Sequence, residues 1–206
     1  GIWVTNSSKK LVGHLNYDSR ILDGAFRANT TEFDIGQSGN DVTFTDKTAH
    51  SVAPVDVAQV SLGAATSLPE NARVVQGGSR LAVMDASGGQ VWLSQVSSPS
   101  STAYTDEGAV ATDMDQGVAT VSQKGTLFAI SPRAGRRISV TREGQLDRLK
   151  STDIKGLSAN AELVLTAVGE QPVALDTRNR VLVLPDGSLR NLADDGISAS
   201  VTLQDV

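Results

Sequence analysis

The amino-acid sequence predicts an all-β fold made of a small antiparallel unit that recurs along the chain. Residues 77–95 carry the clearest copy, in which Leu81 and Val83 belong to one alternating run and Val91 and Leu93 to a second, on either side of a polar turn at residues 85–89. Two alternating runs around a short turn are typical of a β-hairpin. The same pattern occupies residues 43–56, 128–141 and 173–186, with a weaker copy at residues 12–25.

The spacing of these copies predicts how the units are arranged. The first turn residues of the five copies are Asn16, Asp46, Asp85, Ser131 and Asp176. They are separated by 30, 39, 46 and 45 residues, and one four-stranded propeller blade takes about 40 to 50. We therefore predict a β-propeller of about five four-stranded blades, as a single domain or a propeller fragment over residues 1–206. The alternative is a β-sandwich, which does not require a hairpin at near-constant spacing.

Individual segments complete this prediction. Residues 1–6, 11–16 and 20–28 form a short first unit of three strands, residues 60–69 an outer strand, and residues 97–108 a loop. Residues 141–150 alternatively form a helical turn or two, interrupted by Gly144. Residues 197–206 read as a last strand. This strand either closes the ring against residues 1–6, or the chain is an incomplete part of a larger propeller whose exposed sheet edges pair with another molecule, including a second copy.

Composition excludes several classes of protein. A formal net charge of −5 gives no electrostatic basis for binding nucleic acid. No run approaches the roughly 18 apolar residues of a membrane-spanning helix, and the first residues lack a signal-peptide pattern. We therefore expect no direct membrane insertion of this segment. The absence of cysteine excludes disulfides and thiolate metal sites, and 4% aromatic residues argue against an aromatic cage.

No motif in the chain predicts catalysis, a cofactor or a metal. His14 lies within an alternating strand and His50 in a turn, so a two-histidine metal site would require chance convergence. Asp113 and Asp115 have the first spacing of a calcium loop but not its remaining ligands. There is no Gly-x-Ser-x-Gly motif for a nucleophilic serine. We expect no catalytic, cofactor-binding or metal-binding residues and no cofactor.

Four residues are candidates for contacting a partner. Arg133, Arg136 and Arg137 form a basic cluster near a blade edge, where charge equally serves to block unwanted strand addition. Trp92 alternates with Val91 and Leu93 and so points to the face opposite theirs. A lone tryptophan there either packs between blades or lies on an exposed face that binds a partner.

The repeats also resemble a known group of proteins. Residues 3–6 (WVTN) and 11–16 (LVGHLN), with the units beginning at Phe33, Leu81, Lys124 and Gln171, resemble the N-terminal β-propeller region of actinobacterial cell-surface proteins that carry immunoglobulin-like or fibronectin type III repeats. Residues 3–6 are also similar to the YVTN-type blade of other extracellular propellers, with tryptophan in place of tyrosine. The resemblance covers nearly the whole chain and brings no catalytic residues.

The resemblance implies an extracellular protein that is anchored to the bacterial cell surface in its full-length form. It implies a non-catalytic binding or adhesion module that recognises another protein or a cell-surface polymer through loops on one rim. One alternative is the sensor ectodomain of a membrane kinase. The other is a propeller enzyme, such as a lactonase or lyase, for which the chain has few histidine and tyrosine side chains.

Overall fold

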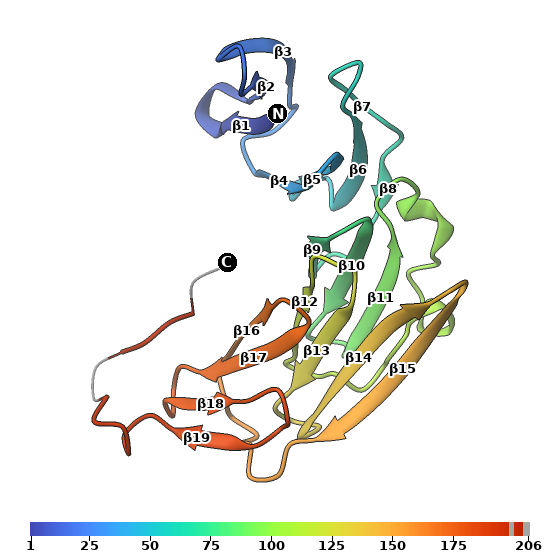
Figure 1. Ribbon diagram of the computed structural model, residues 1–206. Helices are drawn as coiled ribbons and strands as arrows, with labels where there is room; N and C mark the ends of the chain where they lie inside the picture. Colours follow the sequence, from blue (N-terminus) through green and yellow to red (C-terminus); the bar gives the residue numbers. More distant parts are fainter. Residues whose placement is uncertain (198–199, 204–206) are drawn as a thin grey trace.

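The computed structural model describes residues 1–197 and 200–203. Its strands form five antiparallel sheets, which follow one another in chain order around an arc (Figure 1). The first strand of each sheet lies on the inside of the arc, and β1, β4, β9, β12 and β16 contact one another in that order. We call the sheets blades 1 to 5. The predicted all-β architecture of about five radial units is confirmed.

The blades differ in the number of their strands. Blade 1 contains β1 (Ile2–Asn6), β2 (Leu11–Asn16) and β3 (Ile21–Arg27), and blade 3 contains β9 (Ala72–Gly77), β10 (Arg80–Asp85) and β11 (Gln90–Gln95). Blade 4 contains β12 (Val118–Val121), β13 (Leu127–Ser131), β14 (Arg136–Glu143) and β15 (Leu146–Asp153). Blade 5 contains β16 (Leu163–Val168), β17 (Gln171–Asp176), β18 (Val181–Val183) and β19 (Leu189–Asn191).

Blade 2 has a divided outer strand. It contains β4 (Phe33–Ser38), β5 (Asp41–Asp46) and β6 (Ser51–Asp56), followed by β7 (Ser61–Leu62) and β8 (Thr66–Ser67), both of which pair with β6. Residues 60–69 therefore supply two short strands instead of the single one predicted. Blade 1 has the three strands predicted for the short first unit, whereas the expectation of a four-stranded blade is wrong for blade 3, which has three strands in the described part of the chain. Three short 3-10 helices cover Ser7–Lys9, Pro99–Ser101 and Asp106–Gly108.

Apolar cores lie between consecutive blades. In β10, Leu81 and Val83 pack with residues of blade 2, whereas Ala82 and Met84 pack with residues of blade 4. Strand β13 divides its side chains in the same way between blades 3 and 5. Successive residues of a strand point to opposite faces, so each blade shares its two faces with its two neighbours. Burying one such aliphatic side chain contributes about 1.5–3 kcal/mol.

The hairpin turns have a common cap. Oδ1 of Asp46 accepts hydrogen bonds from the amides of Thr48 (2.9 Å) and Ala49 (2.8 Å). Equivalent bonds are accepted by Asn16, Asp85 and Asp176, and Ser131 Oγ accepts one from the Ala134 amide. The five turn residues identified in the sequence thus occupy corresponding places. A sixth, Asp56, caps the turn from β6 to β7 and was not identified there.

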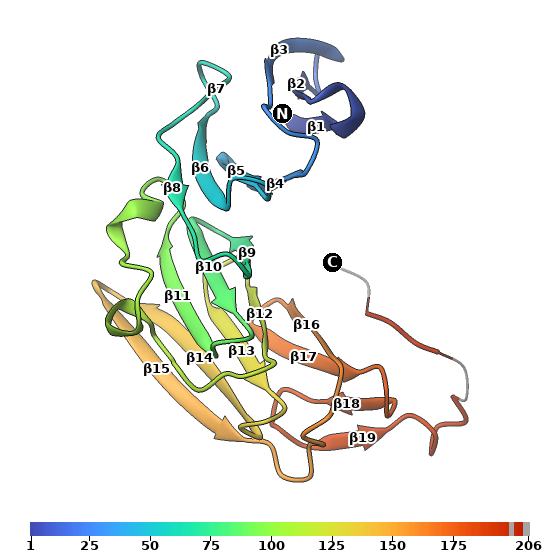
Figure 2. The same cartoon turned by 180° about the vertical axis from the view of Figure 1, so that it is seen from behind.

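The two ends of the arc remain apart. Blade 1 and blade 5 lie at opposite ends, and the chain that follows β19 leaves blade 5 on the open side (Figures 1 and 2). Of the predicted last strand, residues 198–199 and 204–206 lie outside the described residues, and residues 197 and 200–203 form no strand. Within the described residues β1 pairs with β2 alone, so no strand closes the ring against residues 1–6.

Candidate functional site

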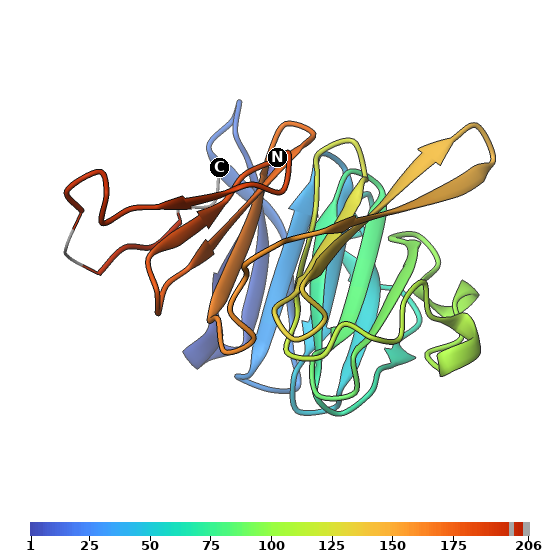
Figure 3. The same cartoon turned by 90° about the horizontal axis from the view of Figure 1, so that it is seen from below.

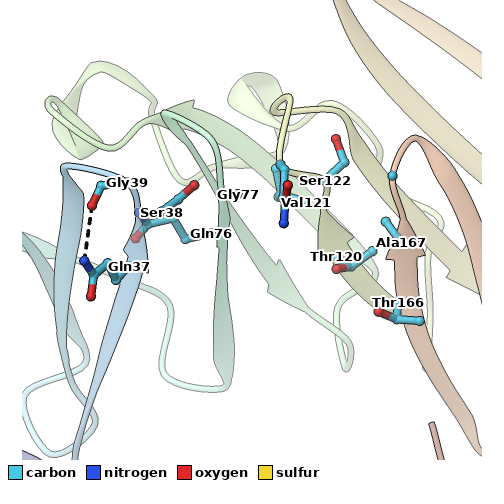
Figure 4. A pocket seen from close by; sticks show the side chains of 12 residues that line it. Gln37, Ser38, Gly39, Gln76, Gly77, Thr120, Val121, Ser122, Thr166 and Ala167 are labelled. Atoms are coloured by element: carbon cyan, nitrogen blue, oxygen red, sulfur yellow. Dashed lines mark hydrogen bonds between the residues drawn. The ribbon is translucent and has the colours of Figure 1, made fainter. Parts of the chain in front are cut away.

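A cavity of about 650 Å³ opens where four inner strands end. Strands β4, β9, β12 and β16 end side by side at one rim of the arc, and the turns that follow them form the wall of the cavity (Figure 4). The lining residues are Gln37, Ser38, Gly39, Gln76, Gly77, Thr120, Val121, Ser122, Gln123, Thr166, Ala167 and Gly169. We call this cavity the channel mouth.

The channel mouth is polar but uncharged. Its lining residues supply amide and hydroxyl groups, and none of them is Asp, Glu, His, Lys or Arg. Burying a charged ligand without an opposite charge is costly, whereas amides and hydroxyls pair with neutral donors and acceptors. Such a lining fits a neutral polar ligand.

Two glutamines connect neighbouring blades at this site. Gln37 Oε1 accepts a hydrogen bond from the Trp3 amide (3.2 Å), and its Nε2 donates to the Gly1 carbonyl (3.0 Å). Gln76 Oε1 accepts from Thr43 Oγ1 (2.7 Å), and its Nε2 donates to the Asp41 carbonyl (2.7 Å). Neither residue was predicted from the sequence to contribute to a site. Their signal is a glutamine two positions before the glycine that begins each turn, Gly39 and Gly78.

Two threonine hydroxyls at the channel mouth are available to a ligand. Thr120 on β12 and Thr166 on β16 are half-buried and lie on the neighbouring inner strands of blades 4 and 5 (Figure 4). Among the residues that the structure describes, neither hydroxyl has a hydrogen-bond partner. Each can therefore donate one hydrogen bond and accept another without breaking a contact of the protein.

Glu170 holds the turns of blades 4 and 5 together beside this cavity. Its Oε2 accepts a hydrogen bond from Thr126 Oγ1 (2.6 Å), and the Thr126 amide donates to Ser122 Oγ (3.0 Å). Burial raises the pKa of Glu170, but hydrogen bonds from Thr126, Ser122 and the Lys124 amide outweigh that effect and lower the pKa overall. Glu170 thereby fixes Ser122, which lines the channel mouth.

The four predicted partner-binding residues lie elsewhere. The turn that carries Arg133 joins β13 to β14, at the end of β13 opposite the channel mouth. Arg133 is exposed, whereas Arg136 is half-buried and paired with Asp113. Arg137 is buried and donates to the carbonyls of Leu184 (3.1 Å) and Pro185 (2.5 Å). Burial lowers the pKa of the Arg137 guanidinium, and nearby Asp186 opposes that shift.

Trp92 packs inside the protein rather than presenting a free surface. It is 3% exposed, its Nε1 donates to the Thr105 carbonyl (2.7 Å), and its ring contacts Tyr104 edge-on at 5.8 Å. Its neighbours Val91 and Leu93 belong to the core shared with blade 4, so the predicted opposite orientation of Trp92 is correct. Trp92 holds residues 96–109 against blade 3, and partner binding stays a prediction for the exposed Arg133.

The histidines and acidic pairs have local partners. His14 Nδ1 lies 2.6 Å from Asp23 Oδ1, and its ring lies 5.2 Å from that of Trp3. His50 is exposed in the turn after β5. In the described part of the chain, no three His, Cys, Asp or Glu side chains are grouped to hold a metal ion. Nor does that part contain a helix with the length and apolar character needed to cross a membrane.

Comparisons with known proteins bear on the fold. No protein-family model matches the chain, and no curated protein does. Solved structures that are similar include the dihydro-heme d1 dehydrogenase NirN in complex with DHE, at TM-score 0.62 and 13% identity over 98% of this chain and 43% of that chain. Hsv2 from Kluyveromyces lactis has a TM-score of 0.60 and 8% identity over 86% of this chain and 55% of its own.

A third similar structure is a catalytically inactive histidine-to-alanine variant of virginiamycin B lyase from Staphylococcus aureus with quinupristin. Its TM-score is 0.55, at 12% identity over 91% of this chain and 64% of that chain. The three are β-propellers, and the likeness shows that this chain has the same type of fold. The chain spans less than two-thirds of the length of each of them.

Proposed function

We propose that this chain is a non-catalytic binding module that holds a neutral, hydrogen-bonding segment of a protein or a cell-surface polymer at the channel mouth. The observation that carries the proposal is the lining, in which four inner strands present amides and hydroxyls and no ionisable side chain. General acid–base catalysis depends on a titratable group within reach of the reacting atoms. Recognition of a neutral ligand needs only positioned donors and acceptors in a concave site.

The proposed setting follows the resemblance of the repeats. We propose an exported, envelope-associated protein in which the propeller contributes adhesion. The blades share their cores with their neighbours, which supports a rigid scaffold whose rim keeps its shape when a ligand binds. Exposed Arg133 on the opposite rim is a second contact point for an acidic partner.

The binding proposal is tested by screening two arrays, one of neutral and acidic oligosaccharides and one of uncharged and charged peptides. Calorimetry with the best probe then compares the wild type with the double variant Thr120→Val and Thr166→Val. Valine keeps the shape and removes both hydroxyls, and two hydrogen bonds at about 0.5–1.5 kcal/mol each correspond to roughly tenfold weaker binding. Thr141→Val, at an exposed position of strand β14, is the matched control and should bind as the wild type does.

Two results would reject the proposal: binding of the best neutral probe by the double variant with wild-type affinity, or equal loss of affinity in the control. The competing function is a propeller enzyme, which the likeness in fold to virginiamycin B lyase favours. Incubation with quinupristin followed by mass spectrometry tests it directly. Turnover of quinupristin that survives in the Thr120→Val and Thr166→Val double variant would place a reaction outside the site proposed here.

A further inference from the structure

Blade 1 has one packed face and one exposed apolar face. Trp3, Val12 and Phe26 pack in the core shared with blade 2. On the opposite face, Ile2, Val4 and Leu22 are 47%, 39% and 59% exposed. Large apolar side chains that lie singly on a surface need no explanation, but a contiguous group on one sheet face marks an interaction site.

These side chains form a single surface. In the register of blade 1, Ile2 is opposite Leu15, Val4 is opposite Gly13, and Leu15 is opposite Leu22. The side chains of Val4 and Leu22 lie over Gly13, because a Cβ added there would be 3.6 Å from Val4 Cγ2 and 2.9 Å from Leu22 Cδ2. We call the surface of Ile2, Val4, Gly13, Leu15 and Leu22 the open face.

The open face has the composition of the faces that are already packed within the protein. Strand β10 offers Leu81 and Val83 to blade 2, and both are fully buried there. The open face offers the same kinds of side chain with no blade against it, since blade 1 is the first of the arc (Figures 1 and 2). In blade 3, which is apolar on both faces, both faces are buried against the neighbouring blades.

We propose that the open face packs against a further β-propeller blade of the same polypeptide, which continues the ring beyond blade 1. Two observations favour a blade over a second copy of this chain. The existing blades join face to face through apolar cores, which is the contact the open face is equipped to make. The similar propellers are also longer, this chain spanning 64%, 55% and 43% of their lengths. The inference does not depend on what the channel mouth binds.

Footprinting tests the proposal. The 206-residue chain and the complete natural polypeptide are labelled with a photoactivated carbene, and labelled residues are located by mass spectrometry. We expect labelling of Ile2, Val4 and Leu22 to fall several-fold in the complete polypeptide at a monomeric mass. Leu146 and Leu149 on β15 are the internal control, because they are similarly exposed (63% and 58%) and lie in another blade. Their labelling should be the same in both proteins.

A matched pair of variants adds a second measurement. Leu22→Asp should leave the melting temperature of the 206-residue chain nearly unchanged and lower that of the complete polypeptide by several degrees, about 4 °C or more. Leu146→Asp should have the same small effect in both. The proposal is overturned if labelling of the open face is unchanged in the complete polypeptide. It is also overturned if protection appears only with a dimeric mass, which would assign the face to a second copy.

Discussion

Six hairpin turns of this chain share one arrangement of residues. In each, a side-chain oxygen caps the turn, and the residue four positions later has a positive φ. Gly89 and Gly135 occupy that position at low cost. His50 (φ 48°) and Val60 (φ 52°) adopt the same left-handed conformation, which residues other than glycine disfavour. All six turns therefore have the cap, whereas backbone strain is confined to the turns in which a residue other than glycine has the positive φ.

His50 should be replaceable with a gain in stability. It is exposed, and glycine would relieve a backbone strain of about 1–2 kcal/mol. The greater conformational entropy that glycine gives the unfolded chain would offset roughly 0.5–1 kcal/mol of that gain. We expect His50→Gly to raise the free energy of unfolding by about 0.5 kcal/mol, measured by urea denaturation. Lys47→Gly, in the same turn but with no positive φ, is the control and should show no gain.

Val60 shows why some strain is kept. A Cβ added at Gly24 of blade 1 would lie 2.5 Å from Val60 Cγ2, so the valine of blade 2 packs directly on this glycine. We expect Gly24→Ala to lower the free energy of unfolding by about 1–3 kcal/mol through overpacking. Adding Val60→Ala should recover part of that loss. A double-mutant cycle measures the coupling, and additive effects would contradict the contact.

Glu170 should make stability depend on pH. Its pKa is lowered in the folded protein, so its contribution is fully present above the unfolded value near 4.3 and is lost as the pH falls through the folded value. At pH 7 we expect Glu170→Gln to be destabilised by about 1 kcal/mol, the scale of one charge-assisted hydrogen bond that is partly open to solvent. The difference between variant and wild type should shrink at pH 3. A constant difference would mean that the charge contributes nothing.

Strands were predictable where their alternating side chains are buried. The hairpins β5–β6, β10–β11, β13–β14 and β17–β18 were anticipated. The side chains of the first three hairpins divide between two cores, and Ala174 and Val183 of the last lie in the core shared with blade 4. Outer strands were predictable only in part: residues 20–28 and 60–69 were expected to form strands, whereas β15 was not identified as one. Every residue of β15 except Thr152 is exposed, so its sequence has no apolar period, and residues 141–150 were open to a helical interpretation. The channel mouth was missed for a related reason, because its residues come from four distant strand ends and form no local motif.

The long β14–β15 hairpin, which projects beyond its blade (Figure 3), forms an ion pair with a buried arginine of blade 3. Arg80 Nη2 donates to Asp147 Oδ2 at 2.7 Å, and the Arg80 side chain is 6% exposed. Asp147→Ala would leave that guanidinium without its carboxylate, and we expect a loss of about 1–3 kcal/mol in urea denaturation. Asp153→Ala, an exposed aspartate on the same strand, is the control.

Asp147→Ala removes the ion pair and also leaves the charge of Arg80 buried without its carboxylate, and a second substitution separates these two effects. Adding Arg80→Met to Asp147→Ala removes the unpaired charge, and an apolar replacement of a buried ion pair is often neutral or stabilising. The double variant should therefore be more stable than Asp147→Ala alone. If it is less stable, Arg80 contributes through packing and not through its charge, since its aliphatic part also supports Gly125 in the next turn.

At the scale of the whole molecule, the shared cores couple each blade to its neighbours. Blades 2, 3 and 4 are packed on both faces, whereas blade 1 is packed only against blade 2. Repeat proteins are stabilised by nearest-neighbour interfaces, so a unit with one interface opens more readily than a unit with two. The arc should therefore be least stable at its ends, although the sequence repeats look alike.

Native-state hydrogen exchange measures this gradient. We expect the amides of β2 in blade 1 to exchange through an opening that costs less free energy than the opening of β10 in blade 3, because Val12 is buried from one side of its sheet and Leu81 and Ala82 from both. If a further blade covers the open face, protection of β2 should rise toward that of β10 in the complete polypeptide. Equal protection of β2 and β10 in the 206-residue chain would mean that the five blades open as one unit, and that the missing interface of blade 1 has no energetic consequence.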